Sequence, residues 1–251
     1  MSYQMRQSFF KKICCNFQPY ISLLCSSRSL AAQFVVPQFK HFCRFLLASF
    51  LLLPSVTHAS IADITRIYKQ TPKLEDFEIC TGGGCAEVKQ VGLTRDEWKV
   101  VADIFDEPSS VSDASLERKH IAEAIGALEK IVGAKTGTHT DRAGTFDNAN
   151  YPGQLDCNDE AINSTTYMRL MQQHGLIKLH QTEDMRTRSY FIFGWPHSTA
   201  VINELATGER YAVDSWFYDN GLPATIVPFA VWKSGYFPPD SPIIKGRAAA
   251  K

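Results

Sequence analysis

The sequence predicts an α+β protein in which helices pack on an antiparallel β-sheet. Hydrophobic residues recur every three or four positions through much of the segment 93–171, which is the spacing of amphipathic helices. Between residues 176 and 216 the period changes to two, and turn-forming residues separate the segments, as in consecutive strands. Helices followed by strands is the element order of an α+β fold. A chain of 251 residues with 45% apolar content suffices for one domain, expected over residues 60–240.

The first 59 residues predict a leader. They contain six basic residues and no acidic ones, and the apolar run Phe45–Leu53 precedes a Thr-His-Ala59 cleavage signal. These features are typical of a signal peptide, here about residues 36–59, with a start at Val35 or Val36 and an upstream part that is untranslated or disordered. An organellar transit peptide is the alternative. The apolar run is too short to span a bilayer, so we expect a periplasmic or secreted protein without a membrane span. Residues 241–251 at the other end of the chain are expected to form a flexible tail.

The charge of the expected mature chain excludes one class of partner. Without the leader, 20 basic and 26 acidic residues remain, which is a formal charge of −6. A nucleic-acid-binding domain needs a basic surface to neutralise phosphates. We therefore expect no nucleic-acid partner.

Cysteine usage agrees with export and singles out one thiol. Four of the seven cysteines lie in the leader. Cys80 and Cys85 flank a Thr-Gly-Gly-Gly spacer that lets the two thiols meet, so a disulfide is expected in an oxidising compartment; a redox or metal-binding pair is the alternative. Cys157 has no remaining partner. It is either a reactive nucleophile or a small buried hydrophobe.

The helices are predicted first. Residues 60–93 have no clear period and predict an irregular segment. Thr94 and Glu97 have the spacing of a capping box and begin a helix that Pro108 ends. A second helix follows over 116–132 and is ended by Gly133, with a charged face expected in solvent; that face comprises Glu117, Lys119, Glu123 and Lys130. Residues 136–151 predict a loop.

A third helix begins at Cys157 and leads into the predicted sheet. Acidic residues occupy its first turn, and His174-Gly175 has the pattern of a C-cap. Strands are expected over residues 176–182, 188–194, 197–204 and 210–216, followed by a turn at 219–221.

A cysteine at a helix start is suited to nucleophilic catalysis. The unpaired N–H groups and the positive end of the helix dipole favour the thiolate, and the same N–H groups can hold an oxyanion. Such a nucleophile needs a base and a group that orients the base. His197 and Asp214 lie on the two arms of one predicted hairpin, where a two- or four-residue loop places them on one face. Depending on the turn, they lie opposite each other or staggered along the strands.

These residues carry a resemblance to a known family. The segments Leu155–Ala161, Pro196–Ile202 and Tyr211–Trp216 resemble the cysteine, histidine and aspartate segments of the transglutaminase-like superfamily, whose core is shared with papain-type proteases. The chain is also similar to predicted bacterial transglutaminase-like cysteine proteinases, which are exported. It departs from their pattern at Asn158, where an acid is usual, and at Leu155, where glycine is usual.

The resemblance implies a Cys157–His197–Asp214 triad and acyl transfer through a thioester. Gln154 is the expected side-chain contributor to an oxyanion site. No cofactor is expected apart from calcium, for which Asp156 and Asp159 are the candidate ligands. A protein or peptide substrate is expected. Hydrolysis of its amide or peptide bond is favoured over transfer of the acyl group to an amine, because water is always present.

Several alternatives accompany this interpretation. His139, His174 and His180 are competing bases. The aromatic residues of the segment 195–218 line an acyl-binding cleft or belong to the core; they are Trp195, Trp216, Phe217 and Tyr218. The three triad residues are also suitable zinc ligands. Finally, the chain could be an inactive transglutaminase-like module that binds a partner in the cell envelope.

Overall fold

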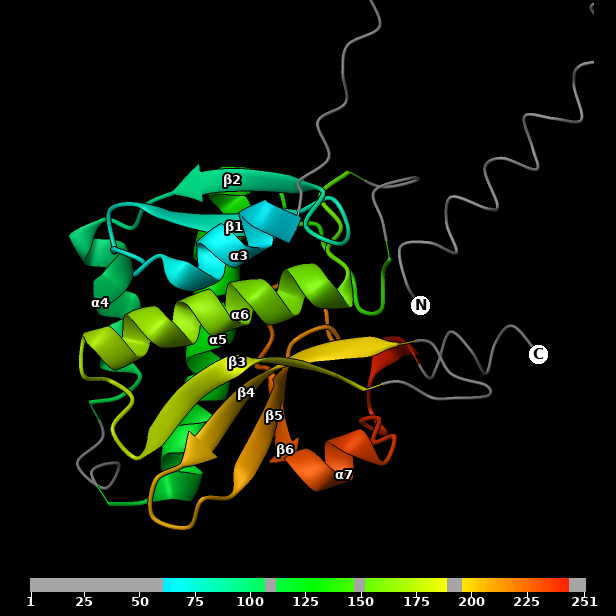
Figure 1. Ribbon diagram of the computed structural model, residues 1–251. Helices are drawn as coiled ribbons and strands as arrows, with labels where there is room; N and C mark the ends of the chain where they lie inside the picture. Colours follow the sequence, from blue (N-terminus) through cyan, green and yellow to red (C-terminus); the bar gives the residue numbers. More distant parts are fainter. Residues whose placement is uncertain (1–60, 107–111, 147–151, 189–195, 244–251) are drawn as a thin grey trace, which may run out of the picture. The chain divides into compact units, whose positions relative to one another are not determined.

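The computed structural model describes residues 61–106, 112–146, 152–188 and 196–243, all within the compact unit Thr57–Lys251. The expected leader, the end of the tail and Trp195 lie outside the described residues. The described chain is a mixed α/β structure with antiparallel sheets and packed helices (Figure 1). This agrees with the α+β class predicted from the sequence.

The N-terminal part is more regular than its sequence predicted. Helix α3 (Ile61–Lys69) precedes a two-stranded antiparallel hairpin formed by β1 (Phe77–Thr81) and β2 (Glu87–Val91). The prediction of an irregular segment was wrong, because a five-residue strand is too short to show a clear period. The predicted disulfide is confirmed: Cys80 and Cys85 are bonded, with Cα atoms 4.5 Å apart, and close the hairpin turn.

The next two helices differ in how closely they follow the prediction. Helix α4 (Arg95–Asp103) has the predicted capping box between Thr94 and Glu97. Helix α5 (Ala114–Thr136) runs through Gly133 and ends at Gly137, whose φ of +83° suits a glycine cap. A Cβ at Gly133 would lie 3.0 Å from the backbone nitrogen of His139, so this glycine permits close packing and does not break the helix.

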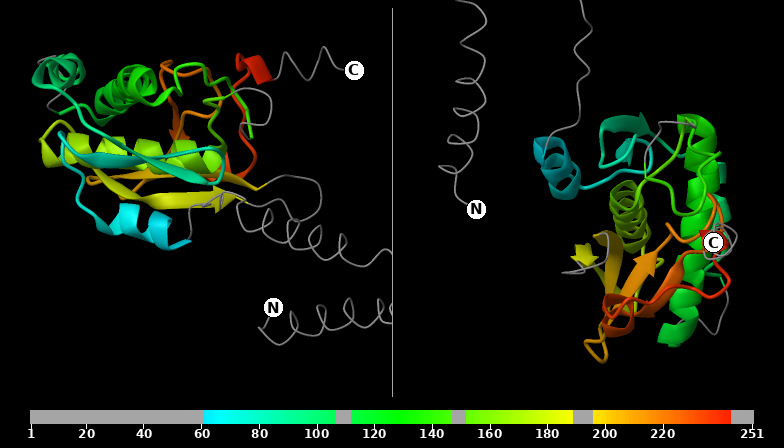
Figure 2. Two further views of the ribbon diagram at one scale, coloured as in Figure 1. Left: turned by 90° about the horizontal axis from the view of Figure 1, so that it is seen from above. Right: turned by 90° about the vertical axis from the view of Figure 1, so that its right-hand side faces the viewer.

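Helix α6 (Cys157–Gln173) is the central element. It packs against β1, against α5 and against the sheet strands β3, β4 and β5 (Figures 1 and 2). Asp156 forms its N-cap, and the predicted C-cap is confirmed, since His174 ends the helix and Gly175 follows with a φ of +72°. Most of its polar residues are buried as well as its apolar ones. A helix enclosed on all sides cannot show a strong amphipathic pattern.

The second sheet has four antiparallel strands in the order β3–β4–β5–β6. These are β3 (His180–Arg188), β4 (His197–Glu204), β5 (Arg210–Asp214) and β6 (Thr225–Pro228), and β6 leads into helix α7 (Phe229–Lys233). The sequence predicted two strands in this region, over 176–182 and 188–194, whereas the structure has one strand, β3. The first prediction agrees over residues 180–182 and missed 183–187, and residues 189–194 lie outside the described residues. The β3–β4 register shifts between Glu183 and Arg186, and that irregularity obscures the alternation.

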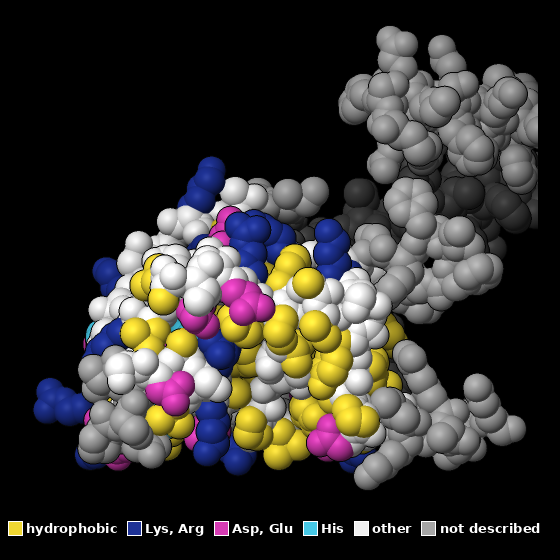
Figure 3. All heavy atoms as spheres, turned by 90° about the horizontal axis from the view of Figure 1, so that it is seen from below, with side chains coloured by type: hydrophobic (Ala, Val, Ile, Leu, Met, Phe, Trp, Pro, Cys, Tyr) yellow, Lys and Arg dark blue, Asp and Glu magenta, His cyan; other side chains and the backbone are white. Residues whose placement is uncertain are grey.

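The surface is mixed. On the face seen from below, hydrophobic side chains lie among basic and acidic ones (Figure 3). The large hydrophobic residues that are exposed come from different elements and loops: Val100, Phe146, Leu205, Leu222 and Val231. Within the described ranges, no helix combines the length and the apolar content needed to cross a membrane.

Candidate active site

The hairpin register brings His197 and Asp214 together. Ala200 pairs with Val213 and Asn203 with Arg210, so His197 and Asp214 lie two residues apart along the paired strands and on the same face. Nε2 of His197 is 2.6 Å from Oδ2 of Asp214. Both residues are buried, with relative exposures of 6% and 2%. The staggered arrangement is therefore the one that the protein adopts.

Cys157 joins this pair from helix α6. The backbone N–H of Ser198, the residue after His197, lies near enough to the thiol to lower its pKa. Cys157 also packs in one cluster with Trp216 and Phe217, and the rings of these two residues lie 4.7 and 5.3 Å from the His197 ring between centroids. The structure thus places the three sequence-predicted residues in one region, from α6, β4 and β5.

The two nitrogens of His197 have different environments. Nε2 bonds to Asp214, and a carboxylate can only accept, so the ring proton belongs on Nε2. Nδ1 is buried, and no atom of the described residues forms a hydrogen bond with it. A neutral imidazole in this tautomer has a lone pair on Nδ1, which can accept a proton.

The resting state of Cys157 differs from the sequence-based expectation. Burial, together with the charges of Asp156 and Asp214, raises the pKa of the thiol to about 11. The backbone N–H groups of Ser198 and of Cys157 itself lower the pKa, but burial outweighs them. Burial therefore outweighs the N–H groups at the start of the helix, and a nucleophilic role of this thiol would need a base that removes its proton.

A second link fixes the nucleophile against the histidine strand. Ser198 Oγ donates to Oδ1 of Asn158 over 2.8 Å and lies 2.9 Å from Oγ1 of Thr187. Asn158 follows Cys157, and Ser198 follows His197. This bridge ties the start of α6 to the start of β4, and it uses the position at which the sequence departs from the resembled family.

The loop between Cys80 and Cys85 is hydrogen-bonded to the start of α6. The backbone N–H groups of Gly83 and Cys85 donate to Asp159 over 2.7 and 2.6 Å, and that of Gly84 donates to Asp156 over 2.8 Å. Successive N–H groups in left-handed conformations form a nest for anions. The two candidate calcium ligands are therefore held by backbone donors. The described residues contain no group of three or more His, Cys, Asp or Glu side chains placed to hold a metal ion.

Gln154 is bound into the loop that precedes the cysteine. Its Nε2 donates to the Thr140 carbonyl over 3.0 Å, and its Oε1 accepts from the Arg142 N–H over 3.1 Å. The side chain is 2% exposed. These contacts fix the approach of the chain to Cys157. A role of Gln154 in holding an oxyanion stays a prediction.

Three carboxyl groups are buried beneath the site, and the sequence did not reveal them. Burial raises the pKa of Asp141 to about 9 and that of Glu129 to about 7, and it also raises the pKa of Glu160 well above its usual value. Ser215, which follows Asp214, donates to Glu160. Asp141 accepts from the Leu155 N–H over 2.7 Å. Buried carboxyl groups with raised pKa values thus support both the cysteine segment and the aspartate strand.

Trp232 on helix α7 was also missed by the sequence analysis. Its Nε1 donates to Oδ2 of Asp214 over 2.7 Å, and the residue is fully buried. The only sequence signal is an aromatic residue in the proline-bearing stretch after the last predicted strand. That signal does not distinguish a contact with Asp214 from ordinary core packing.

Aromatic side chains extend from the site toward the surface. Trp216 contacts Phe146 edge to face, with centroids 5.5 Å apart, and Phe146 is 55% exposed. Phe217 is fully buried, and Tyr218 packs partly buried against the same cluster. Phe217 therefore belongs to the core, whereas Trp216 connects the histidine with an exposed aromatic ring.

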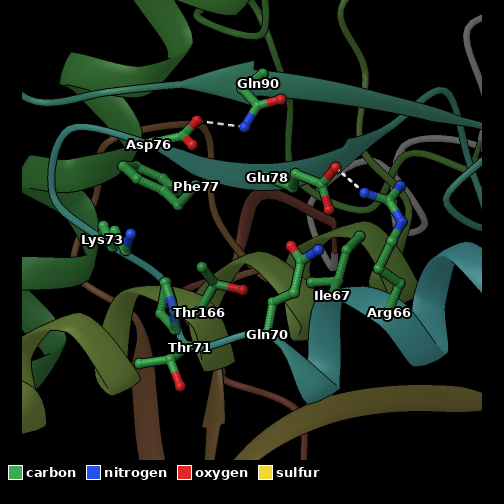
Figure 4. A pocket seen from close by; sticks show the side chains of 11 residues that line it. Arg66, Ile67, Gln70, Thr71, Lys73, Asp76, Phe77, Glu78, Gln90 and Thr166 are labelled. Atoms are coloured by element: carbon green, nitrogen blue, oxygen red, sulfur yellow. Dashed lines mark hydrogen bonds and ion pairs between the residues drawn. The ribbon is translucent and has the colours of Figure 1, made fainter.

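A separate cavity of about 380 Å³ lies between α3, the β1–β2 hairpin and α6 (Figure 4). Its lining is polar, and three of its charged groups have partners, since Arg66 pairs with Glu78 and Asp76 accepts from Gln90. Thr166 is its contribution from α6. None of the three predicted triad residues lines this cavity, so the arrangement around Cys157 is the candidate active site.

Comparison of the chain with family models, with curated proteins and with solved structures finds no match.

Proposed function

We propose that this protein is an exported thiol hydrolase with a transglutaminase-like core, which cleaves an amide or peptide bond with Cys157, His197 and Asp214. One observation carries the proposal. Nε2 of His197 is bound to Asp214, whereas the buried Nδ1 has no hydrogen-bond partner among the described residues, and the backbone N–H of the next residue, Ser198, lies near the Cys157 thiol. A histidine oriented by a carboxylate, close to a thiol that needs a base, has the chemistry of a nucleophilic triad.

The first half of the reaction forms a thioester. Nδ1 takes the thiol proton as the sulfur bonds to the carbonyl carbon, and the carbonyl π electrons move to oxygen. The Asn158 and Asp159 N–H groups are occupied by Asp156 Oδ1. The N–H of Cys157 is close enough to the sulfur to lower the pKa of the thiol, so it is our candidate oxyanion donor. When the tetrahedral intermediate collapses, the C–N bond breaks and Nδ1 returns the proton to the leaving nitrogen.

The second half releases the acyl group. Nδ1 removes a proton from water as the water oxygen attacks the thioester carbon. The C–S bond then breaks, the carboxylic acid leaves, and the sulfur recovers its proton from Nδ1. Asp214 holds the imidazole in position and stabilises the imidazolium in both halves without taking the proton.

Acylation by an activated ester tests this proposal. Incubation with p-nitrophenyl acetate should release nitrophenolate and place an acetyl group on Cys157, which mass spectrometry locates and hydroxylamine removes. Cys157→Ala should abolish the labelling, and His197→Ala should slow it strongly. Rapid acetylation that does not depend on His197 would contradict the triad.

The same experiment separates the alternatives. An inactive binding module would leave Cys157 unacetylated in a folded protein. A zinc site formed by the three residues would retain the metal through dialysis, but these residues do not form a group that could hold one. Export is supported by the disulfide. For the natural substrate, peptides released from an envelope extract by the wild type and not by Cys157→Ala would identify the cleaved bond.

A further inference from the structure

The short helix α7 brings an additional side chain to the orienting carboxylate. Trp232 donates from Nε1 to Oδ2 of Asp214, the same oxygen that accepts from Nε2 of His197. The Trp232 and His197 rings are tilted by 39° with centroids 5.8 Å apart. One carboxylate oxygen therefore lies between a histidine and an indole, both of which are buried.

We propose that Trp232 is a positioning residue of this active site, which fixes the Asp214 carboxylate so that Oδ2 faces Nε2 of His197. The inference rests on the proposed function. A buried carboxylate needs hydrogen-bond donors to remain charged, and a donor with a defined direction also sets its orientation. An indole N–H meets both requirements, because it can donate and cannot accept.

Trp232 is itself held in place from two sides. The guanidinium of Arg188 lies over the indole ring at 4.6 Å, and it donates to the carbonyl groups of Trp232 and Tyr236. Phe229 of the same helix stacks on the Trp232 ring, with the two centroids 5.5 Å apart. Cys157, His197 and the cation of Arg188 are the titratable or charged groups around the Asp214–Trp232 contact. The donor is thus rigid, as a positioning role requires.

Trp232→Phe tests the proposal, because it keeps an aromatic ring and removes the N–H. The matched control is Trp98→Phe, the same change on α4, where Trp98 packs against His174. We measure acetylation of Cys157 by p-nitrophenyl acetate from pH 5 to 10. Trp232→Phe should slow it about 10- to 100-fold, the loss expected for a hydrogen bond to a charged group. Trp98→Phe should leave the rate unchanged.

The pH profile distinguishes positioning from packing. Without the indole N–H, Asp214 becomes a stronger base and binds the imidazolium more tightly, so the acid limb of the profile should move to higher pH. In an Asp214→Asn background, Trp232→Phe should have little further effect, because the two residues act through one contact. Circular dichroism verifies that each variant is folded.

Two outcomes would overturn the inference. An unchanged rate and pH profile in folded Trp232→Phe would show that the N–H is not used. If Trp232→Phe slowed acetylation equally in the wild-type and the Asp214→Asn backgrounds, Trp232 would act by packing alone. Failure of the proposed function is recognised separately, because the wild type would then show no His197-dependent acetylation.

Discussion

The described residues include two buried histidine–carboxylate pairs, and of these two the His197–Asp214 pair adjoins the cysteine. His180 Nδ1 is 2.8 Å from Glu117, and its Nε2 is 3.1 Å from the Arg118 guanidinium. Both nitrogens of His180 are therefore engaged. His197 is bound to Asp214 through Nε2 alone, and its Nδ1 has no partner among the described residues. The free nitrogen, and not the carboxylate, distinguishes the proposed base from a structural histidine.

The carboxylates of the two pairs also have different partners. Glu117 accepts from the backbone N–H groups of Lys178 and Leu179. Burial raises the pKa of Glu117, but the hydrogen bonds from His180 and from this backbone lower it more. Glu117 thus joins α5 to the start of β3, whereas Asp214 has an indole and an imidazole as donors. The first pair stabilises the chain, and the second orients a ring.

The largest expected effect separates the two histidines by activity. His197→Ala should reduce the acetylation rate of Cys157 about 100- to 10,000-fold, the usual contribution of a general base. His180→Ala should leave the rate per folded molecule unchanged. It should instead lower the free energy of unfolding by about 1–3 kcal/mol, because Glu117 loses a buried partner. Stopped-flow kinetics and urea unfolding measure the two quantities. A large rate loss in folded His180→Ala would contradict the comparison.

Substitution of the two carboxylates should likewise separate an effect on rate from an effect on stability. Asp214→Asn should reduce the acetylation rate about 100-fold or more, because an amide allows the wrong histidine tautomer. Glu117→Gln is the matched change in the other pair, and it should affect stability alone, by about 1–3 kcal/mol. NMR of ring-labelled histidine reports the tautomers of His197 and His180 in each variant. Retention of the Nε2-protonated form of His197 in Asp214→Asn would show that Asp214 does not set it.

Loss of the disulfide should affect the site around Cys157 and His197 and leave the His180–Glu117 pair unchanged. Replacement of Cys80 and Cys85 by serine should cost about 2 kcal/mol of stability, the value expected for a short closed loop. The freed loop should hold Asp156 and Asp159 less tightly, so we expect acetylation of Cys157 to slow by a few fold. The His180 signals in the NMR spectrum should be unchanged. An unaltered rate in the folded double variant would show that the loop only stabilises the hairpin.

The last comparison concerns the pH dependence of stability. Glu117 has a lowered pKa when folded, so its contribution is present above the usual carboxyl pKa and is lost as the pH falls below it. Glu129 has a raised pKa of about 7, so its contribution is present below the usual value and is lost as the pH rises toward 7. Glu129→Gln should therefore flatten the decline in stability between pH 5 and 7, by up to about 1.4 kcal/mol per pH unit.

Unfolding at a series of pH values measures this difference. Glu123→Gln, an exposed change on the same helix α5, is the control and should leave the pH dependence unaltered. A wild-type stability that does not decline between pH 5 and 7 would mean that Glu129 is not protonated in the folded protein.

The sequence predicted local features with short-range causes. The Thr94–Glu97 capping box, the helix that begins at Cys157 and the strand from His197 were all predicted, because each depends on neighbouring residues. The disulfide was predicted for the same reason, since the flexible spacer keeps the two thiols close. Gly133 was misinterpreted because its close neighbour, His139, is visible only once the chain folds back.

The sequence by itself determined which residues supply a thiol, an imidazole and a carboxylate, and it placed the last two on one hairpin. Only the tertiary structure decided the hairpin register, the free Nδ1 of His197 and the burial that keeps Cys157 protonated. It also decided that Trp232 reaches Asp214. These properties depend on atoms distant in the sequence, and burial and hydrogen bonding are set by whichever groups the fold brings together.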